Sequence, residues 1–172
     1  MEDLKSSSTL LERRGVELFE TDRGGRATVH SPGQLVAYPI FRLEGTDLHD
    51  FLWRLEESVL LLLMELDIPA ERKERYPGVW AGAEKVAAVG LAVRDGVTSH
   101  GLALNVNNDL SLFDLITPCG IREFGVTSIQ ALLNLPLSME AVQSAYVRCF
   151  ARAFQREVGP EGERAPLQSV AR

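Results

Sequence analysis

Apolar residues recur every three or four positions between residues 48 and 66, so one side of this stretch forms a continuous hydrophobic face. That spacing predicts an amphipathic helix, with Thr46 or Asp47 suited to cap its start. A second stretch, over residues 138–158, repeats the pattern from Val142 onwards. We therefore expect two long helices, each with one face against a core.

Shorter apolar runs, rich in Val, Ile and Phe and bounded by Gly, Pro or Asp, predict strands. Asp95-Gly96 separates two of these runs and is a residue pair preferred in tight hairpin turns. We predict an α+β fold, a mixed or antiparallel sheet with packed helices. The predicted strands cover residues 16–19, 27–30, 35–41, 79–81, 85–93 and 98–106.

Composition limits the class of protein. The 172 residues are 45% hydrophobic, which suits a single domain over residues 1–172, with residues 159–172 expected to form a flexible tail. The net charge of −6 argues against nucleic-acid binding, which needs a positive surface. No apolar run is long enough to cross a bilayer, and two cysteines make no disulfide framework. These features predict a cytoplasmic protein that binds neither nucleic acid nor membrane.

Two residues stand out as candidate catalytic groups. Cys119 lies between Pro118 and Gly120, in a loop that precedes a short helix predicted to begin at residue 127 or 128, whereas Cys149 falls on the apolar face of the last helix. A nucleophilic thiol needs a cation or base nearby, because a free thiol is only about 3% ionised at neutral pH. Lys85, which opens a very apolar strand, is one candidate partner.

Each of these assignments has an alternative on the sequence alone. Cys119 is also compatible with a structural role, and Lys85 with an edge-strand lysine that limits aggregation. His30 and His100 both end or interrupt predicted strands beside small residues, so a cysteine–histidine pair stays open. The glycine-rich stretch 22–26 matches neither a phosphate loop nor a dinucleotide fingerprint and indicates only a turn.

Several segments, taken in order, carry a family resemblance. They are DRGGRATVH (22–30), PGQ (32–34), YP (38–39), PGVW (77–80), KVAAVG (85–90), TSHGLALNVN (98–107), DLITPCGI (114–121) and GVTS (125–128). Together they resemble the octanoyltransferase family, also called lipoyl(octanoyl) transferase or lipoate-protein ligase B. The separation of Lys85 and Cys119 also follows the family pattern.

The resemblance implies a fold like the catalytic domains of biotin and lipoate protein ligases. It implies transfer of an octanoyl group from octanoyl-acyl carrier protein to a lysine of lipoyl domains, in 2-oxoacid dehydrogenases and the glycine cleavage H protein. Cys119 falls on the family's nucleophile and Lys85 on the lysine that lowers its pKa and acts as general acid and base. No metal and no cofactor is implied. The implied substrate-binding residues are Arg23, Gly24, Gly25, Arg26, Ala27, Thr28, Val29, His30, Ala88, Val89, Gly90, Gly101, Leu102 and Ala103.

This chain departs from the family pattern in its binding segment and at its start. Ser31 stands where the family usually has glycine, and Arg26 replaces a commoner Gln, Asp or Glu. Family members usually carry several dozen residues before the segment that begins this chain, so we expect the usual N-terminal segment to be lacking. Two rival readings are an ATP-dependent lipoate or biotin ligase-like enzyme and a truncated, non-catalytic binder of carrier or lipoyl domains.

Overall fold

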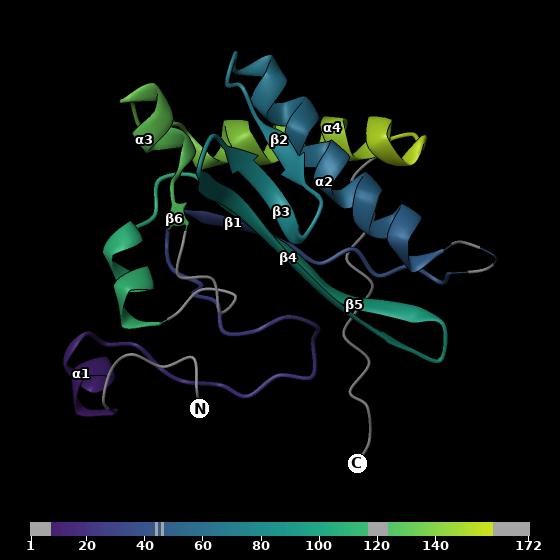
Figure 1. Cartoon of the computed structure of the whole chain (residues 1–172). Coiled ribbons are helices and arrows are strands. Elements are labelled where there is room, and N and C mark those ends of the chain that lie inside the picture. Colours follow the sequence, from purple (N-terminus) through teal and green to yellow (C-terminus); the bar gives the residue numbers. More distant parts are fainter. Residues whose placement is uncertain (1–7, 44, 46, 117–123, 160–172) are drawn as a thin grey trace.

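In the part of the chain that the structure describes, the fold is centred on one six-stranded β-sheet. The computed structural model describes residues 8–43, 45, 47–116 and 124–159. Five strands run antiparallel in the order β1-β5-β4-β3-β2, and β6 pairs in parallel with the start of β4 (Figure 1). The strands are β1 (Gln34–Ala37), β2 (Glu71–Lys73), β3 (Tyr76–Ala81), β4 (Glu84–Arg94), β5 (Val97–Asn105) and β6 (Gly125–Val126).

The longest pairing joins β4 to β5 through a two-residue turn. Arg94 pairs with Val97, and both turn residues have positive φ, 51° at Asp95 and 75° at Gly96. That conformation suits the right-handed twist of a hairpin and is accessible to aspartate and glycine. The hairpin predicted at Asp95-Gly96 is therefore confirmed.

Two long helices pack against each other and against one face of the sheet. They are α2 (Leu48–Glu65), capped by the Asp47 side chain, and α4 (Met139–Phe154), capped by Ser138. Their apolar faces enclose the main core together with β3, β4 and β5. The core includes Phe51, Leu55, Val59, Leu62, Leu63, Val79, Val86, Ala87, Leu102, Leu104, Val142, Tyr146 and Cys149.

Shorter helices complete the described chain. They are α1 (Ser8–Arg13), the 3-10 helix η1 (Leu110–Leu115) and α3 (Ile129–Leu133). The Ser128 side chain caps α3 by accepting a hydrogen bond from the Ala131 N–H, so the predicted short helix is present. η1 lies away from α2 and α4, on the side of the sheet where the segment before β1 passes (Figure 1).

The structure corrects several predicted boundaries. Residues 16–19 and 27–30 form no strand, and the strand predicted over 35–41 is β1, which ends at Ala37. The last helix ends at Phe154 rather than residue 158, because Gln155 adopts a left-handed conformation with φ of 53°. The predicted tail, residues 159–172, lies outside the described residues except for Gly159.

Candidate active site

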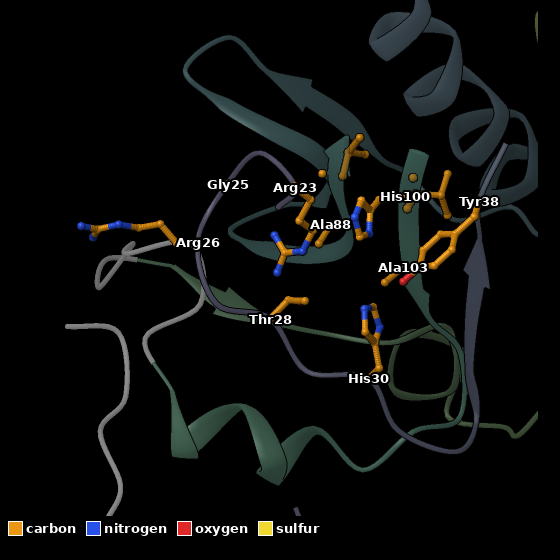
Figure 2. Close-up of a pocket in the computed structure, with 13 residues that line it drawn as sticks. Arg23, Gly25, Arg26, Thr28, His30, Tyr38, Ala88, His100 and Ala103 are labelled. Carbon is orange, nitrogen blue, oxygen red and sulfur yellow. The ribbon is translucent and has the colours of Figure 1, made fainter. Parts of the chain in front are cut away.

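An outer pocket lies where β4 and β5 pass under the segment that precedes β1. Figure 2 shows the side chains of Thr28, His30, Tyr38 and His100 around one space, with the Arg26 guanidinium extending away from it. The lining is Arg23, Gly25, Arg26, Thr28, His30, Tyr38, Ala88, Val89, Gly90, His100, Gly101, Leu102 and Ala103. Eleven of the fourteen residues predicted to bind substrate belong to this lining.

Two glycines allow other chain segments to approach the sheet here. Gly90 pairs with Gly101 across β4 and β5. A Cβ at Gly90 would lie 2.9 Å from the carbonyl oxygen of Gly24, and one at Gly101 would lie 2.1 Å from that of Ala37. The Gly24 N–H donates to the Leu91 carbonyl at 2.7 Å, so the loop rests directly on β4. Glycine is needed at both strand positions because backbone occupies the space of a side chain.

An aspartate–histidine pair stands at one side of the outer pocket. His100 Nε2 lies 3.0 Å from Asp22 Oδ1, and the His100 ring packs edge-on against Tyr38 with centroids 5.6 Å apart. The hydrogen bond from His100 lowers the pKa of the exposed Asp22 carboxyl. The histidine has φ of 59°, in the left-handed region that residues other than glycine adopt uncommonly. His100 therefore links the loop before β1 to strand β5.

Residues 26–30 alternate between two environments although they form no strand. Arg26, Thr28 and His30 line the outer pocket. Val29 is buried with Phe113 and Ile116 in a separate small core, and Ala27 packs against the same cluster. An extended backbone points successive side chains to opposite sides, so Ala27 and Val29 support the pocket wall from behind instead of lining it. Gly24, the third predicted residue outside the lining, meets β4 through its backbone.

An inner pocket continues from the outer one and contains Lys85. The two pockets share Thr28, Ala88 and Ala103. Lys85 is buried, its Nζ donates to the Pro77 carbonyl oxygen at 2.9 Å, and the same nitrogen lies 4.8 Å from the Trp80 ring centroid. The inner pocket is lined by Thr28, Gln34, Lys85, Ala88, Ala103, Asn105, Phe113 and Val126.

A β-bulge turns Lys85 toward this pocket. Val79 of β3 pairs with Ala87 of β4, but the next residue, Trp80, pairs with Lys85, which makes Val86 an extra residue. Strict alternation would place Lys85 on the same face as Ala87, in the core under the helices. The bulge shifts the alternation by one residue, so Lys85 shares a pocket with Ala88 instead.

The polar wall of the inner pocket is a hydrogen-bonded chain. The Gln34 amide nitrogen donates to the Asn105 side-chain oxygen at 2.9 Å, and its oxygen lies 2.8 Å from His30 Nδ1. The Asn105 amide nitrogen in turn donates to the Thr127 carbonyl at 3.0 Å. These bonds fix the orientation of each amide and connect β1, β5 and the segment after β6 around Lys85.

Cys119, the predicted nucleophile, lies outside the described residues. On either side of residues 117–123, the described chain contributes one residue to the inner pocket. These residues are Phe113 and Val126, which line the pocket together with Lys85. Thr127 also donates its N–H to the Lys85 carbonyl at 3.0 Å. The other cysteine, Cys149, is fully buried in the core, and burial raises the pKa of its thiol to about 11.

Several lining residues were not among the predicted binding residues: Gln34, Tyr38, His100, Asn105, Phe113 and Val126. All except Phe113 fall within segments that carry the family resemblance, so those segments were the available signal. Phe113 lies just before one of them. Within the described part of the chain, no cluster of three His, Cys, Asp or Glu side chains suits a metal ion, and no helix is long and apolar enough to span a bilayer.

Known proteins resemble this chain in both sequence and fold. The family model of the lipoyl protein ligase A/B catalytic domain matches residues 2–151. An octanoyltransferase of Thermoanaerobacter is 49% identical over 83% of this chain and 63% of its own length. One of Caldanaerobacter subterraneus is 51% identical over 81% and 61%, and one of Alkaliphilus metalliredigens 42% identical over 88% and 71%.

Two solved structures show the fold. A crystal structure of lipoate-protein ligase A bound with ATP matches with a TM-score of 0.78 over 93% of this chain and 67% of that one, at 19% identity. The biotin protein ligase of Aquifex aeolicus matches with a TM-score of 0.58 over 72% and 53%, at 20% identity. The predicted fold class is therefore confirmed.

This chain spans about three fifths of the length of the Thermoanaerobacter and Caldanaerobacter relatives. The match of the family model over most of the chain, together with these identities, establishes the relationship that the sequence segments predicted. The chain belongs to the lipoyl protein ligase A/B catalytic domain family and, within that family, to the octanoyltransferases.

Proposed function

We propose that this protein transfers an octanoyl group from octanoyl-acyl carrier protein to a lysine of lipoyl domains, through a thioester on Cys119. The observation that carries the proposal is the buried Lys85 at the inner end of two joined pockets. Phe113 and Val126, from the chain on either side of the Cys119 segment, line the same inner pocket. The names of the relatives, octanoyltransferase, support the acyl group.

In the first step the proposed nucleophile is the Cys119 thiolate, formed when the thiol gives its proton to Lys85. A nearby ammonium group favours the thiolate. The sulfur attacks the thioester carbonyl carbon of the donor, a new carbon–sulfur bond forms and the bond to the carrier sulfur breaks. Lys85 then gives its proton to the departing carrier thiolate. The products are an octanoyl-Cys119 thioester, a free carrier thiol and a neutral Lys85.

In the second step the neutral amine of the acceptor lysine attacks the octanoyl carbonyl carbon. A carbon–nitrogen bond forms and the bond to the Cys119 sulfur breaks. Neutral Lys85 accepts the proton lost by the attacking amine, so the thiolate and ammonium are restored together. Replacing one thioester by another is nearly balanced in energy and amide formation is downhill, so the cycle needs no nucleoside triphosphate.

The outer pocket is the proposed site for the alkyl chain. Ala88, Gly90 and Ala103 have small side chains or none, which leaves space above the sheet for a ligand. The pocket extends from solvent toward Lys85. Burying a methylene group contributes about 0.8 kcal/mol, so a chain of eight carbons is favoured over short acyl groups. The predicted binding residues that line the pocket would contact this chain.

The proposed partners are octanoyl-acyl carrier protein as donor and lipoyl domains of 2-oxoacid dehydrogenases and of the glycine cleavage H protein as acceptors, all in the cytoplasm. Acyl carrier proteins are acidic, and Arg13 and Arg14 lie together at the end of α1. We propose that these arginines attract the donor despite the net charge of −6.

The proposal is tested by intact-protein mass spectrometry after incubation with octanoyl-acyl carrier protein in the absence of ATP. We expect a mass increase of one octanoyl group that hydroxylamine removes, and no increase in the Cys119→Ser variant. An increase that requires octanoate and ATP would instead identify a ligase. A folded protein that gains no octanoyl group under either condition would favour the non-catalytic binder.

A further inference from the structure

A carboxylate from the helical layer reaches the segment that holds Lys85. Glu56 of α2 is 9% exposed, and its Oε1 accepts a hydrogen bond from the Gly78 N–H at 2.7 Å. Glu56 and Lys85 are the two charged side chains that are buried in the described part of the chain. Burying a charge is costly unless it is paired and hydrogen-bonded, so a buried glutamate at this place calls for an explanation.

Glu56 and Lys85 bind opposite ends of one peptide group. The N–H of the Pro77–Gly78 peptide donates to Glu56, and its carbonyl oxygen, on Pro77, accepts from Lys85 Nζ at 2.9 Å. A peptide group is planar and rigid, so fixing the direction of the N–H also fixes the direction of the carbonyl. The carboxylate polarises the peptide and strengthens the bond that the carbonyl makes with the ammonium.

The surroundings leave this peptide little freedom. Gly78 has φ of 119°, which L side chains rarely adopt. A Cβ there would lie 2.4 Å from the Ala87 carbonyl oxygen and 3.4 Å from both Cδ and Cε of Lys85. The peptide therefore lies against the stem of Lys85 as well as against its amino group.

Arg72 of β2 offsets the charge of Glu56. Its Nε lies 3.2 Å from Glu56 Oε2, its Nη2 donates to Glu57, and its guanidinium lies 4.3 Å from the Trp53 ring centroid. Two carboxylates thus share one arginine, but only Glu56 also accepts the Gly78 N–H. Glu57 is consequently a matched control for the loss of one arginine partner.

We propose that Glu56 is a positioning residue for Lys85 and acts through the Pro77–Gly78 peptide. This inference rests on the proposed function, in which Lys85 exchanges protons with the reacting sulfur and amine. Glu56 keeps the Pro77 carbonyl aimed at Lys85 Nζ, which holds the ammonium at the inner pocket. Without that carboxylate the Gly78 N–H loses its acceptor. The Pro77 carbonyl is then no longer held toward Lys85 Nζ, and the orientation of the ammonium group is no longer fixed.

The test measures the rate of octanoyl-Cys119 formation by quenched-flow mass spectrometry of the full chain. Glu56→Met removes the acceptor at nearly constant side-chain length, Glu56→Gln keeps a neutral acceptor, and Glu57→Gln is the control. Each is made with Lys85 present and again together with Lys85→Met. This double-mutant cycle separates an effect that passes through Lys85 from a general effect on the fold.

With Lys85 present, we expect Glu56→Met to slow acylation about tenfold or more and Glu56→Gln about threefold, since a neutral acceptor bonds more weakly than a carboxylate. In protein that also carries Lys85→Met, Glu56→Met and Glu56→Gln should each change the remaining acylation rate by less than about twofold. Glu57→Gln should stay within about twofold in both backgrounds. Equal slowing by the Glu56 variants in both backgrounds, or no slowing in either, would overturn the inference.

Two further outcomes are distinguishable. If Lys85→Met alone does not slow acylation, the proposed role of Lys85 is wrong and the inference about Glu56 falls with it. If Lys85→Met slows acylation but the Glu56 variants with Lys85 present do not, only the inference about Glu56 fails. Circular dichroism identifies a variant that does not fold, and if Glu56→Met is one, the threefold effect expected for Glu56→Gln decides the question.

Discussion

Ala88 in β4 lies directly opposite Ala103 in β5, and both residues line the outer and the inner pocket. The pair marks the passage from the solvent-facing pocket to Lys85. Small side chains on both strands leave this passage open, and any larger side chain on this face would narrow it.

We predict that Ala88→Leu changes the acyl-chain preference of the protein. The added atoms fill the passage, so octanoyl transfer should fall relative to butanoyl transfer by about tenfold, the effect typical of one or two lost methylene contacts. The measurement is kcat/KM with octanoyl and butanoyl thioesters of acyl carrier protein.

Ala92→Leu is the control for that prediction. Ala92 belongs to the same strand, opposite Ser99, and lines neither pocket. It should leave the ratio of the two rates within about twofold. Equal losses with both donors in Ala88→Leu would mean that the alkyl chain does not lie over Ala88 and Ala103.

A second prediction concerns the close contact of Gly101 with the end of β1. In Gly101→Ala the new methyl group would lie 2.1 Å from the Ala37 carbonyl oxygen and 2.7 Å from Pro39 Cδ. Backbone must move, and we expect the free energy of unfolding to fall by about 2 kcal/mol or more. Urea denaturation monitored by circular dichroism measures the change.

Gly159→Ala gives the comparison, since among the described residues no atom beyond its chain neighbours lies within 4 Å of the added carbon there. It should change the free energy of unfolding by less than about 0.5 kcal/mol. A Gly101→Ala variant as stable as the unmodified protein would show that β1 and β5 separate at this point without cost.

The sequence predicted the elements whose signals are local. The spacing of apolar residues in α2 and α4, the cap expected at Thr46 or Asp47, and the Asp95-Gly96 turn each depend on residues close together in the chain. Local signals also explain the errors in strand prediction. Residues 27–30 have the alternation of a strand, but they lie over the outer pocket and pair with no neighbouring strand of the described chain.

The strand β2 carried no such signal. Its residues, Glu71, Arg72 and Lys73, are all charged, and they pair with β3 at the edge of the sheet. Edge strands often carry charges that prevent pairing with another chain, so composition argued against a strand where tertiary structure makes one. Arg72 also pairs with the buried Glu56 of α2, which only the fold brings within reach.

The sequence indicated which residues belong to the candidate site better than it indicated where their side chains point. Lys85 stood out because it opens an apolar strand, yet its orientation depends on the extra residue Val86, and strict alternation would have buried it among the core residues. A bulge is a property of pairing between strands and has no marker in one strand alone. The hydrogen bonds from Lys85 to the Pro77 carbonyl and from the Gly78 N–H to Glu56 are likewise contacts between elements.

Cys149 is fully buried, with its Sγ 3.6 Å from Glu65 Oε1. Burial, followed by the neighbouring Glu65 carboxylate, raises the pKa of the thiol from 9.0 to about 11. In a Cys119→Ser protein, Cys149 should therefore react with iodoacetamide near neutral pH about a hundredfold more slowly than in the same protein unfolded in urea.

The shift in pKa also predicts a pH dependence of stability. Because the folded state holds the thiol proton more tightly, this contribution to the free energy of unfolding is fully present below pH 9 and is lost as the pH rises toward 11. Urea denaturation across that range should show a steeper loss in the parent protein than in Cys149→Ala. Rapid labelling of Cys149 in the folded protein would mean that the contacts between α2 and α4 open readily. An identical pH dependence in Cys149→Ala would mean that folding does not raise the pKa of this thiol.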